Sequence, residues 1–447
     1  MTRQSTQQPA PSVSGTIIEG LVRLMIVWRV ELSLLVPPTV LYLWLDAKVG
    51  PLPAKAITTV VVLAVVLPPP TRRWLGRVVH RASVRRHLNK TFSSLPGILS
   101  ERRPMVGNVT PTPSGDRVGL GLRRGTSVED LVRAQAVIAA SLGVRDVRAT
   151  ANPARSNEVT LSIVRRDPFE AAAMPCPMVG AHRFNAWGPI PVGVDGEGGM
   201  VHLSLPEHNL LVGGEPGGGK SVALSLLVAA LALDPTVSLW LFDGKLVELA
   251  PWSSCAERFV GPDIEAAIAA LQDLRSEMDR RYGVLVAHQV KKVTPETGLR
   301  LHVLVIDELA LYVAGVDKKL ATRFAELLRD VVARGRAAGI IVLAATQKPS
   351  IDIVPSALRD LFGFRWALRC ATREASDTVL GSGWASQGYS AADIDPGRRG
   401  VGLLLHEGGI PVRLRTFHLA DADVAAIAER ASRLRRADGD TTWKPEP

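Results

Sequence analysis

A glycine-rich segment between an apolar strand and an apolar helix constrains this chain more than any other feature. The strand reads HNLLVGG, and the run from Val222 to Leu233 has the composition of a helix, which Asp234 and Pro235 then end. Between them lies the pattern GxxxxGK[ST], in the strand, loop, helix order that a phosphate-binding loop requires. A glycine-rich turn with a chance Lys-Ser pair is the alternative, and this context disfavours it.

We therefore predict a site for ATP and Mg²⁺ in this loop. The glycines allow backbone N–H groups to surround the phosphates, Lys220 reaches the terminal phosphates, and Ser221 offers its hydroxyl to Mg²⁺. The residues assigned to ATP binding are Gly214, Glu215, Pro216, Gly217, Gly218, Gly219, Lys220, Ser221 and Val222.

The segment RLHVLVIDEL, residues 300–309, predicts a buried parallel strand that ends in two acids. Asp307 is the second predicted Mg²⁺ ligand, and Glu308 is the predicted catalytic residue that polarises the attacking water. An Asp-Glu pair that only caps the next helix is the alternative, which the phosphate-binding loop disfavours. Strands and helices alternate from His202 to about Leu419, which predicts a mainly parallel sheet with helices on both faces. The predicted fold class is an α/β P-loop NTPase of the additional-glutamate (RecA-like) class.

Two further catalytic candidates lie around the next strand, Ile340 to Ala345. Thr346 and Gln347 follow it, and the amide of Gln347 can sense the γ-phosphate or orient water; an ordinary exposed glutamine is the alternative. Just before the strand lies ARGRAAGI, which contains Arg336. In a ring of subunits such an arginine can reach a neighbour's nucleotide as a finger, and a solvated helix end is the alternative.

The net charge of +10 favours a polyanionic partner, either nucleic acid or the anionic inner face of a membrane. Only 3 cysteines occur, with no CxxC pattern and no pair of histidines nearby. Neither a disulfide framework nor a zinc site is therefore indicated, and a reducing cytoplasm is expected.

Two apolar runs predict a membrane hairpin within residues 21–70, behind a flexible segment 1–20. The run from Leu24 to Leu45 carries charges and two prolines, and Ala56 to Leu67 falls short of the roughly 20 residues that cross a bilayer. The basic segment that follows, TRRWLGRVVHRASVRRHLNK, obeys the positive-inside rule and places both ends of the hairpin in the cytoplasm. The predicted location is the inner face of the cell membrane, with the motor in the cytoplasm. Two buried helices with a solvated basic face, or arginines that touch DNA, are the alternatives.

The other boundaries follow from composition and periodicity. The pattern from Val128 to Leu142 is helical, and Glu158 to Val164 alternates as a strand. The predicted parts are a basic juxtamembrane linker over 71–106, a small preceding α+β domain over 107–170, the P-loop motor over 171–420 and a tail over 421–447.

With these pieces in this order, the chain resembles the FtsK/SpoIIIE family of hexameric double-stranded DNA translocases. The segments that carry the resemblance are NLLVGGEPGGGKSVAL, FDGKLVELA, VLVIDELA, RAAGIIVLAATQKPS and RCATREASDTVLG. The resemblance implies a homo-hexamer with double-stranded DNA as partner, and it matches Arg336 to the family's arginine finger. The loop departs from the family's common form at Glu215, Pro216 and Gly218, where Thr or Ser usually occur.

Cell-division members of that family have a longer membrane domain, a long linker and a C-terminal winged helix, whereas about 28 residues follow Leu419 here. This reduced plan most resembles the plasmid-transfer translocases of actinobacteria. It implies a membrane-anchored motor that moves plasmid or integrative-element DNA in conjugation, with a separate DNA-loading protein.

Other functions stay open at this point. A protein-secretion ATPase of the type VII kind usually carries several P-loop domains in series, and this chain has a single GKS. A chromosome-segregation DNA pump is the second alternative. A membrane-tethered DNA-binding scaffold with a dead nucleotide site is disfavoured because Lys220, Asp307 and Glu308 are all present.

Overall fold

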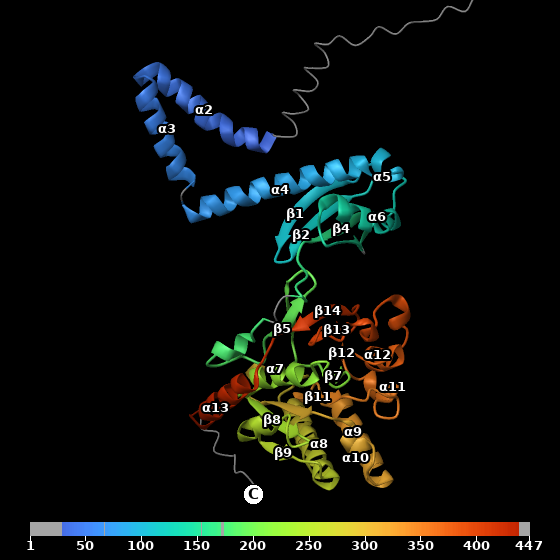
Figure 1. Cartoon of the computed structure of the whole chain (residues 1–447). Helices are drawn as coiled ribbons and strands as arrows, with labels where there is room; N and C mark the ends of the chain where they lie inside the picture. Colours follow the sequence, from blue (N-terminus) through green and yellow to red (C-terminus); the bar gives the residue numbers. More distant parts are fainter. Residues whose placement is uncertain (1–28, 67, 153, 171–173, 438–447) are drawn as a thin grey trace, which may run out of the picture. The chain divides into compact units, whose positions relative to one another are not determined.

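The computed structural model describes the chain in four stretches and divides it into two compact units, Met1–Arg166 and Asp167–Pro447 (Figure 1). The predicted flexible segment 1–20 lies outside the described residues, as do the start of the predicted hairpin and the end of the predicted tail. The described residues are 29–66, 68–152, 154–170 and 174–437.

The N-terminal unit begins with helices over the predicted membrane segments and the predicted linker (Figure 1). Apolar side chains such as Val40, Leu43 and Val60 are exposed on the first two of them. No single helix in the described stretches is long and apolar enough to cross a bilayer; Pro51–Ala64 and Pro69–Ser94 meet the test only as a pair bent by 89°. The membrane hairpin therefore stays a prediction. These helices are α2 (Arg29–Val49), α3 (Pro51–Val66), α4 (Pro69–Ser94) and α5 (Ile98–Glu101).

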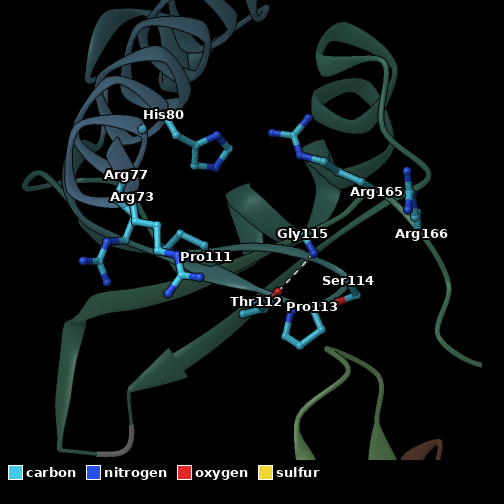
Figure 2. Close-up of a pocket in the computed structure, with 11 residues that line it drawn as sticks. Arg73, Arg77, His80, Pro111, Thr112, Pro113, Ser114, Gly115, Arg165 and Arg166 are labelled. Atoms are coloured by element: carbon cyan, nitrogen blue, oxygen red, sulfur yellow. Dashed lines mark hydrogen bonds between the residues drawn. The ribbon is translucent and has the colours of Figure 1, made fainter. Parts of the chain in front are cut away.

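The rest of this unit is a four-stranded antiparallel sheet with the order β1-β2-β4-β3. Its core joins Leu161 of the sheet to Ile138 of α6 and Phe92 of α4, so the second half of α4 is part of this domain. Helix α6 coincides with the predicted helix and begins at a capping box formed by Ser127 and Asp130. The start of α4 and the turn between β1 and β2 line a pocket (Figure 2). The elements are β1 (Met105–Thr112), β2 (Gly115–Gly121), α6 (Val128–Leu142), β3 (Asp146–Asn152) and β4 (Arg155–Val164).

The second unit is built on a 10-stranded sheet with the order β6-β5-β14-β13-β12-β7-β11-β10-β8-β9. The strands from β12 to β9 run parallel, whereas β13, β14, β5 and β6 are antiparallel to their neighbours, so the sheet is mixed. Only residues 406–411 join β13 to β14, and a parallel pair would need a crossover of roughly a dozen residues. The strands are β5 (Ile190–Asp195), β6 (Met200–Leu203), β7 (Leu210–Gly213), β8 (Val237–Phe242), β9 (Arg258–Val260), β10 (Leu301–Ile306), β11 (Ile340–Thr346), β12 (Phe364–Leu368), β13 (Val401–Leu405) and β14 (Val412–Thr416).

The central strands are buried on both faces, as their continuous apolar sequences predict. In β10, Val303 and Val305 lie in one core with α7 and α13, whereas Leu304 and Ile306 lie in the other with α8 and α10. The prediction of helices on both faces is therefore confirmed. The helices are α7 (Lys220–Ala232), α8 (Ile264–Ala287), α9 (Ala310–Val313), α10 (Lys318–Arg334), α11 (Ser356–Arg359), α12 (Arg373–Leu380) and α13 (Asp421–Ala437).

Helix α13 lies within the predicted tail and packs into the core of this unit. Ile427 and Ala431 are fully buried. Arg435 is also buried, and its guanidinium donates to the carbonyls of Ala232 at 2.9 Å and Val237 at 2.8 Å. These bonds satisfy carbonyl groups at the end of α7 and the start of β8.

Candidate nucleotide site

The carboxyl ends of neighbouring parallel strands bring most of the predicted site residues together. In the order β12-β7-β11-β10, the loop 214–219 follows β7, Asp307 and Glu308 follow β10, and Gln347 follows β11. Ligands of open α/β sheets bind at this edge. The sequence motifs, which are far apart in the chain, therefore share one site.

The glycine-rich loop follows a path that side chains would block. Gly217 and Gly219 have φ angles of 80° and 104°, which L residues rarely adopt. A Cβ on Gly214 would lie 2.8 Å from the Cβ of Leu368 on β12. The loop enters α7 at Lys220, and the free N–H groups of the first helical turn suit phosphate oxygens.

Glu215 places a carboxylate within this loop, where the family's common form is uncharged. Arg369, directly after β12, forms an ion pair with that carboxylate, and the Arg369 carbonyl accepts from the Glu215 N–H at 2.9 Å. The guanidinium offsets a negative charge that would repel the phosphates. The unusual loop sequence is thus accommodated by a residue from the adjacent strand.

Lys220 connects the loop to the acidic segment after β10. Its side chain is 4% exposed, and its ammonium donates to the backbone carbonyl of Asp307. The distance from Lys220 Nζ to Glu308 Oε2 is 3.8 Å. Burial lowers the pKa of Lys220, and the charges of Glu308 and Asp307 act in the opposite direction.

Asp307 is fully buried, and its two carboxylate oxygens differ. Oδ1 accepts from the Gly244 N–H at 3.2 Å, whereas Oδ2 is buried without a hydrogen-bond partner. Burial raises the pKa of Asp307 to about 6, and the charge of Lys220 opposes this. A buried carboxylate oxygen without a donor fits a hard cation, so Asp307 and the hydroxyl of Ser221 are the residues that would hold Mg²⁺.

The described residues contain no group of three or more His, Cys, Asp or Glu side chains that could hold a metal ion alone. Proteins commonly bind Mg²⁺ through one or two carboxylates together with substrate phosphates.

Glu308 is held in place by the end of β11. Its Oε1 accepts from the Thr346 hydroxyl at 2.8 Å, and its Oε2 accepts from the Gln347 N–H at 2.9 Å. Lys245, after β8, lies 3.9 Å from Oε2. Gln347 thus contacts Glu308 through its backbone, and its side chain stays partly exposed.

Arg336 does not join this group in the same chain. It precedes β11, whereas the loop and the acids lie at the other edge of the sheet. Strand β11 has 7 residues, a span of roughly 20 Å. Arg336 donates to the Glu207 carbonyl and pairs with Glu407 at 3.3 Å, and its side chain is 38% exposed.

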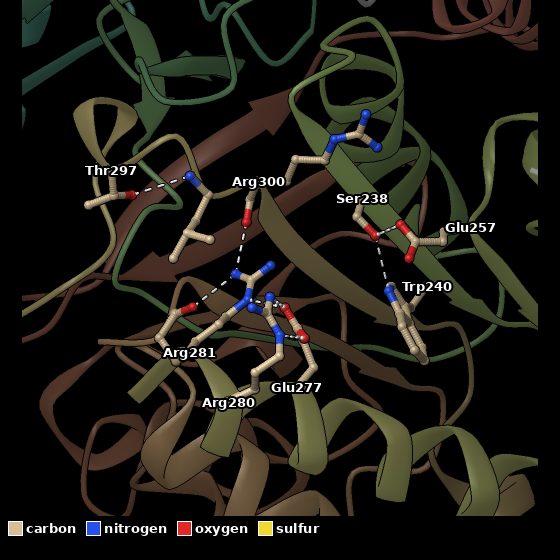
Figure 3. Close-up of polar contacts among 10 residues, drawn as sticks. Ser238, Trp240, Glu257, Glu277, Arg280, Arg281, Thr297 and Arg300 are labelled. Carbon is tan, nitrogen blue, oxygen red and sulfur yellow. Dashed lines mark hydrogen bonds and ion pairs between the residues drawn. The ribbon is translucent and has the colours of Figure 1, made fainter. Parts of the chain in front are cut away.

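Arg281 on α8 contacts the segments that precede β10 and β11, and Figure 3 shows its bonds to Arg300 and Glu277. The side chain is 2% exposed, and Nη1 donates to the carbonyls of Arg300 at 2.8 Å and Ala338 at 2.9 Å. Its Nε donates to Glu277 at 2.7 Å. The amino ends of β10 and β11 are thereby tied to α8.

Residues 181–380, which include the loop, both acids and Arg336, match the model of the FtsK/SpoIIIE family. The chain carries an FtsK/SpoIIIE-family domain. DNA translocase SftA of Bacillus subtilis (strain 168) is 29% identical over 348 residues, covering 73% of this chain and 35% of that protein. DNA translocase FtsK of Pseudomonas aeruginosa is 26% identical over 373 residues, covering 74% of this chain and 44% of that protein. The chain thus spans less than half the length of these relatives.

Solved structures share the fold of this chain. The pCW3 conjugation coupling protein TcpA, in a monomer form with ATPγS, has a TM-score of 0.54 at 20% identity, covering 79% of this chain and 99% of that structure. The cytoplasmic domain of the type VII secretion ATPase EccC of Thermomonospora curvata has a TM-score of 0.50 at 19% identity, covering 62% of this chain and 36% of that structure. At these identities the likeness concerns the fold alone.

Three contributors to this site were not predicted from the sequence. These are Lys245, Arg369 and the hydroxyl of Thr346, all of which contact predicted residues. Each lies directly after or close to the carboxyl end of a parallel strand. That position was the available signal, since every such end lies at the same edge of the sheet.

Proposed function

We propose that this chain is a membrane-anchored, ATP-driven translocase of double-stranded DNA that moves plasmid or integrative-element DNA between cells. The observation that carries the proposal is the convergence of Lys220, Asp307 and Glu308 at one buried edge of the sheet. The relatives named DNA translocases support DNA as the moved polymer. The net charge of +10 suits a polyanion.

ATP hydrolysis follows from the roles of the residues around the loop. The N–H groups of the loop and of the first turn of α7 bind the phosphates, and Lys220 shifts from the Asp307 carbonyl toward the terminal phosphates. Asp307 and the Ser221 hydroxyl would hold Mg²⁺, which would supply positive charge against the phosphates. Glu308, fixed by Thr346 and Gln347, polarises the attacking water.

The active unit is a homo-hexameric ring in which each nucleotide lies between two subunits. Arg336 supports this arrangement, because it sits at the sheet edge away from its own loop and is partly exposed. A neighbouring subunit can then receive Arg336 at its γ-phosphate. DNA passes through the ring, and a separate protein loads it.

The anchor is the α2–α3 hairpin at the inner face of the membrane, followed by the basic start of α4. The full chain should therefore sediment with membranes in high salt. A chain that starts at Thr71 keeps α4, whose Leu88 and Phe92 belong to the core of the small domain, and it should stay in the supernatant. Recovery of the full chain in the supernatant would contradict the anchor.

The ATPase rate with and without double-stranded DNA tests the motor assignment. A rate that rises on addition of duplex DNA is expected. A rate indifferent to DNA would favour the protein-secretion alternative. Comparing plasmid transfer with chromosome inheritance in donor cells that carry Glu308→Gln then separates conjugation from chromosome segregation.

A further inference from the structure

The N-terminal unit contains a strongly cationic pocket that the nucleotide site does not use. It has a volume of about 660 Å³ and is lined by the start of α4, the β1–β2 turn and the residues after β4 (Figure 2). Arg73, Arg77 and His80 come from α4 at spacings of four and three residues, which places them on one helix face. Arg165 and Arg166 approach from the opposite side (Figure 2).

Positive charge exceeds negative charge in this pocket. The adjacent acid is Asp116, which is buried and already occupied, with one oxygen 2.6 Å from His80 Nε2 and the other 3.0 Å from Arg165. Arg73, Arg77 and Arg166 have no hydrogen bond or ion pair from their side chains within the described stretches. Three guanidinium groups therefore line the pocket without a counter-ion among the described residues.

The lining also contains a buried hydroxyl without a partner. Ser114, in the β1–β2 turn, is 5% exposed, and its Oγ makes no hydrogen bond. Its carbonyl accepts from the N–H groups of Arg165 at 2.9 Å and Arg166 at 3.1 Å, which holds the turn against the end of β4. A buried donor without an acceptor is costly, and an anionic oxygen in the pocket would satisfy it.

We propose that this pocket binds the phosphodiester headgroup of an anionic phospholipid. The proposal rests on the proposed membrane anchor, and it adds a specific lipid site that holds the small domain at the membrane surface. Arg73 and Arg77 lie within the first turns of α4, which follows α3 almost directly. Guanidinium groups bind phosphate through paired N–H donors, so several of them suit this anion.

Exposed apolar side chains on α4 and on the preceding helix α3 favour a lipid over the DNA backbone as the source of the phosphate. Trp74, between the two arginines in sequence, is 56% exposed, and Val60 and Leu63 of α3 are exposed at 65% and 48%. Tryptophan is typical of the headgroup region, and exposed aliphatic side chains suit acyl chains. A DNA backbone would match the arginines and leave this apolar surface in water.

The test is a calorimetric titration of the full chain in an uncharged detergent with dioctanoyl phosphatidylglycerol, and separately with dioctanoyl phosphatidylcholine. The double variant Arg73→Gln/Arg77→Gln should bind phosphatidylglycerol on the order of thirtyfold more weakly than the wild type. The matched control is Arg72→Gln/Arg81→Gln, which removes the same charge from exposed positions of the same helix outside the pocket. The control should bind nearly as well as the wild type.

Each other outcome overturns the proposal. Equal losses in both double variants would show a general charge effect without a pocket. Equal affinity for both lipids would show that the anionic charge is not recognised. Duplex DNA binding that falls in the pocket variant while phosphatidylglycerol binding stays unchanged would assign the arginines to DNA.

Two further measurements distinguish a failure of lipid binding from unfolding of the variant and from failure of the proposed motor function. If the double variant unfolds, Arg166→Gln and Ser114→Ala test the same pocket from the opposite side and from the turn. The lipid titration needs no ATP, so a motor without DNA-stimulated turnover would leave its result unaffected. A failed membrane sedimentation with intact phosphatidylglycerol binding would remove the anchor and keep the pocket.

Discussion

Lys220 Nζ and Glu308 Oε2 lie 3.8 Å apart at the buried end of the sheet, and neither side chain is more than 5% exposed. The pair links the phosphate-binding loop after β7 to the acidic segment after β10, across the intervening strand β11. Removing the lysine leaves Glu308 with Lys245 as its nearby cation. In the proposed mechanism the two residues act on different steps, so their loss should have different effects.

Lys220→Ala should lose ATP binding, because the ammonium is the main cation for the terminal phosphates. Glu308→Gln should retain ATP binding and lose turnover, since the amide keeps the shape and cannot polarise water as a base. Fluorescent nucleotide binding and phosphate release measure the two steps separately. An active Glu308→Gln protein would show that the water-activating carboxylate lies elsewhere.

Arg336→Ala should bind ATP and lose turnover by something on the order of a thousandfold, as expected for an arginine finger. Mixing it with Lys220→Ala should recover part of the ATPase rate, because some interfaces then pair an intact loop with an intact Arg336. A parallel mixture of wild type with Lys220→Ala is the control for strict coupling between sites. One outcome would contradict this role. If mixed rings assemble and the control mixture stays active while the mixture of the two mutants stays inactive, then Arg336 does not act between subunits.

Arg281→Ala should lower the free energy of unfolding by about 3 kcal/mol, since the buried carbonyl of Ala338 and the partly buried carbonyl of Arg300 lose a charged donor. The matched control is Arg280→Ala, which also removes a partner of Glu277 but from a side chain that is 58% exposed. The control should cost less than about 1 kcal/mol. Urea titration measures the unfolding free energy of both variants. Equal losses in the two variants would contradict the bracing role of Arg281.

The pH dependence of the unfolding free energy should report the protonation of Glu277, which lies between Arg280 and Arg281. Hydrogen bonds from Arg280, and then from Arg281, lower the pKa of Glu277 to about 2. Because this lies below the ordinary value of 4.5, the stabilisation is complete above about pH 4.5 and is lost as the pH falls toward 2. The gap in unfolding free energy between wild type and Glu277→Gln should therefore be smaller at pH 3 than at pH 7. An unchanged gap would show that Glu277 titrates normally.

Local motifs made much of the candidate site predictable. The spacing of Gly214, Lys220 and Ser221, and the acids after an apolar strand, indicate that the loop and both acids lie at one edge of the sheet. Two contacts could not be predicted: the hydrogen bond from Thr346 to Glu308 and the ion pair between Arg369 and Glu215. Both depend on which strands are neighbours in the sheet. Neighbour order is a long-range property that periodicity does not encode.

The main features of the fold could also be predicted from the sequence. Continuous apolar strands such as β10 indicated burial on both faces, which the structure confirms. The antiparallel pairing of β13 and β14 does not follow from the alternation of strands and helices, because it depends on a connection too short for the crossover that parallel strands need. The helical character of Pro69–Ser94 was also missed, because its many arginines obscured the apolar positions Val84, Leu88 and Phe92 that bury it in the small domain.

Displacement of a triplex-forming strand from duplex DNA tests the translocation claim most directly. The full chain with ATP and Mg²⁺ should displace the third strand, whereas the Glu308→Gln protein should bind the same duplex and leave the strand in place. The rate of strand displacement should be the same on duplexes of different sequence. ATP hydrolysis without strand displacement on any duplex, under conditions where the ring assembles, would contradict a double-stranded DNA translocase.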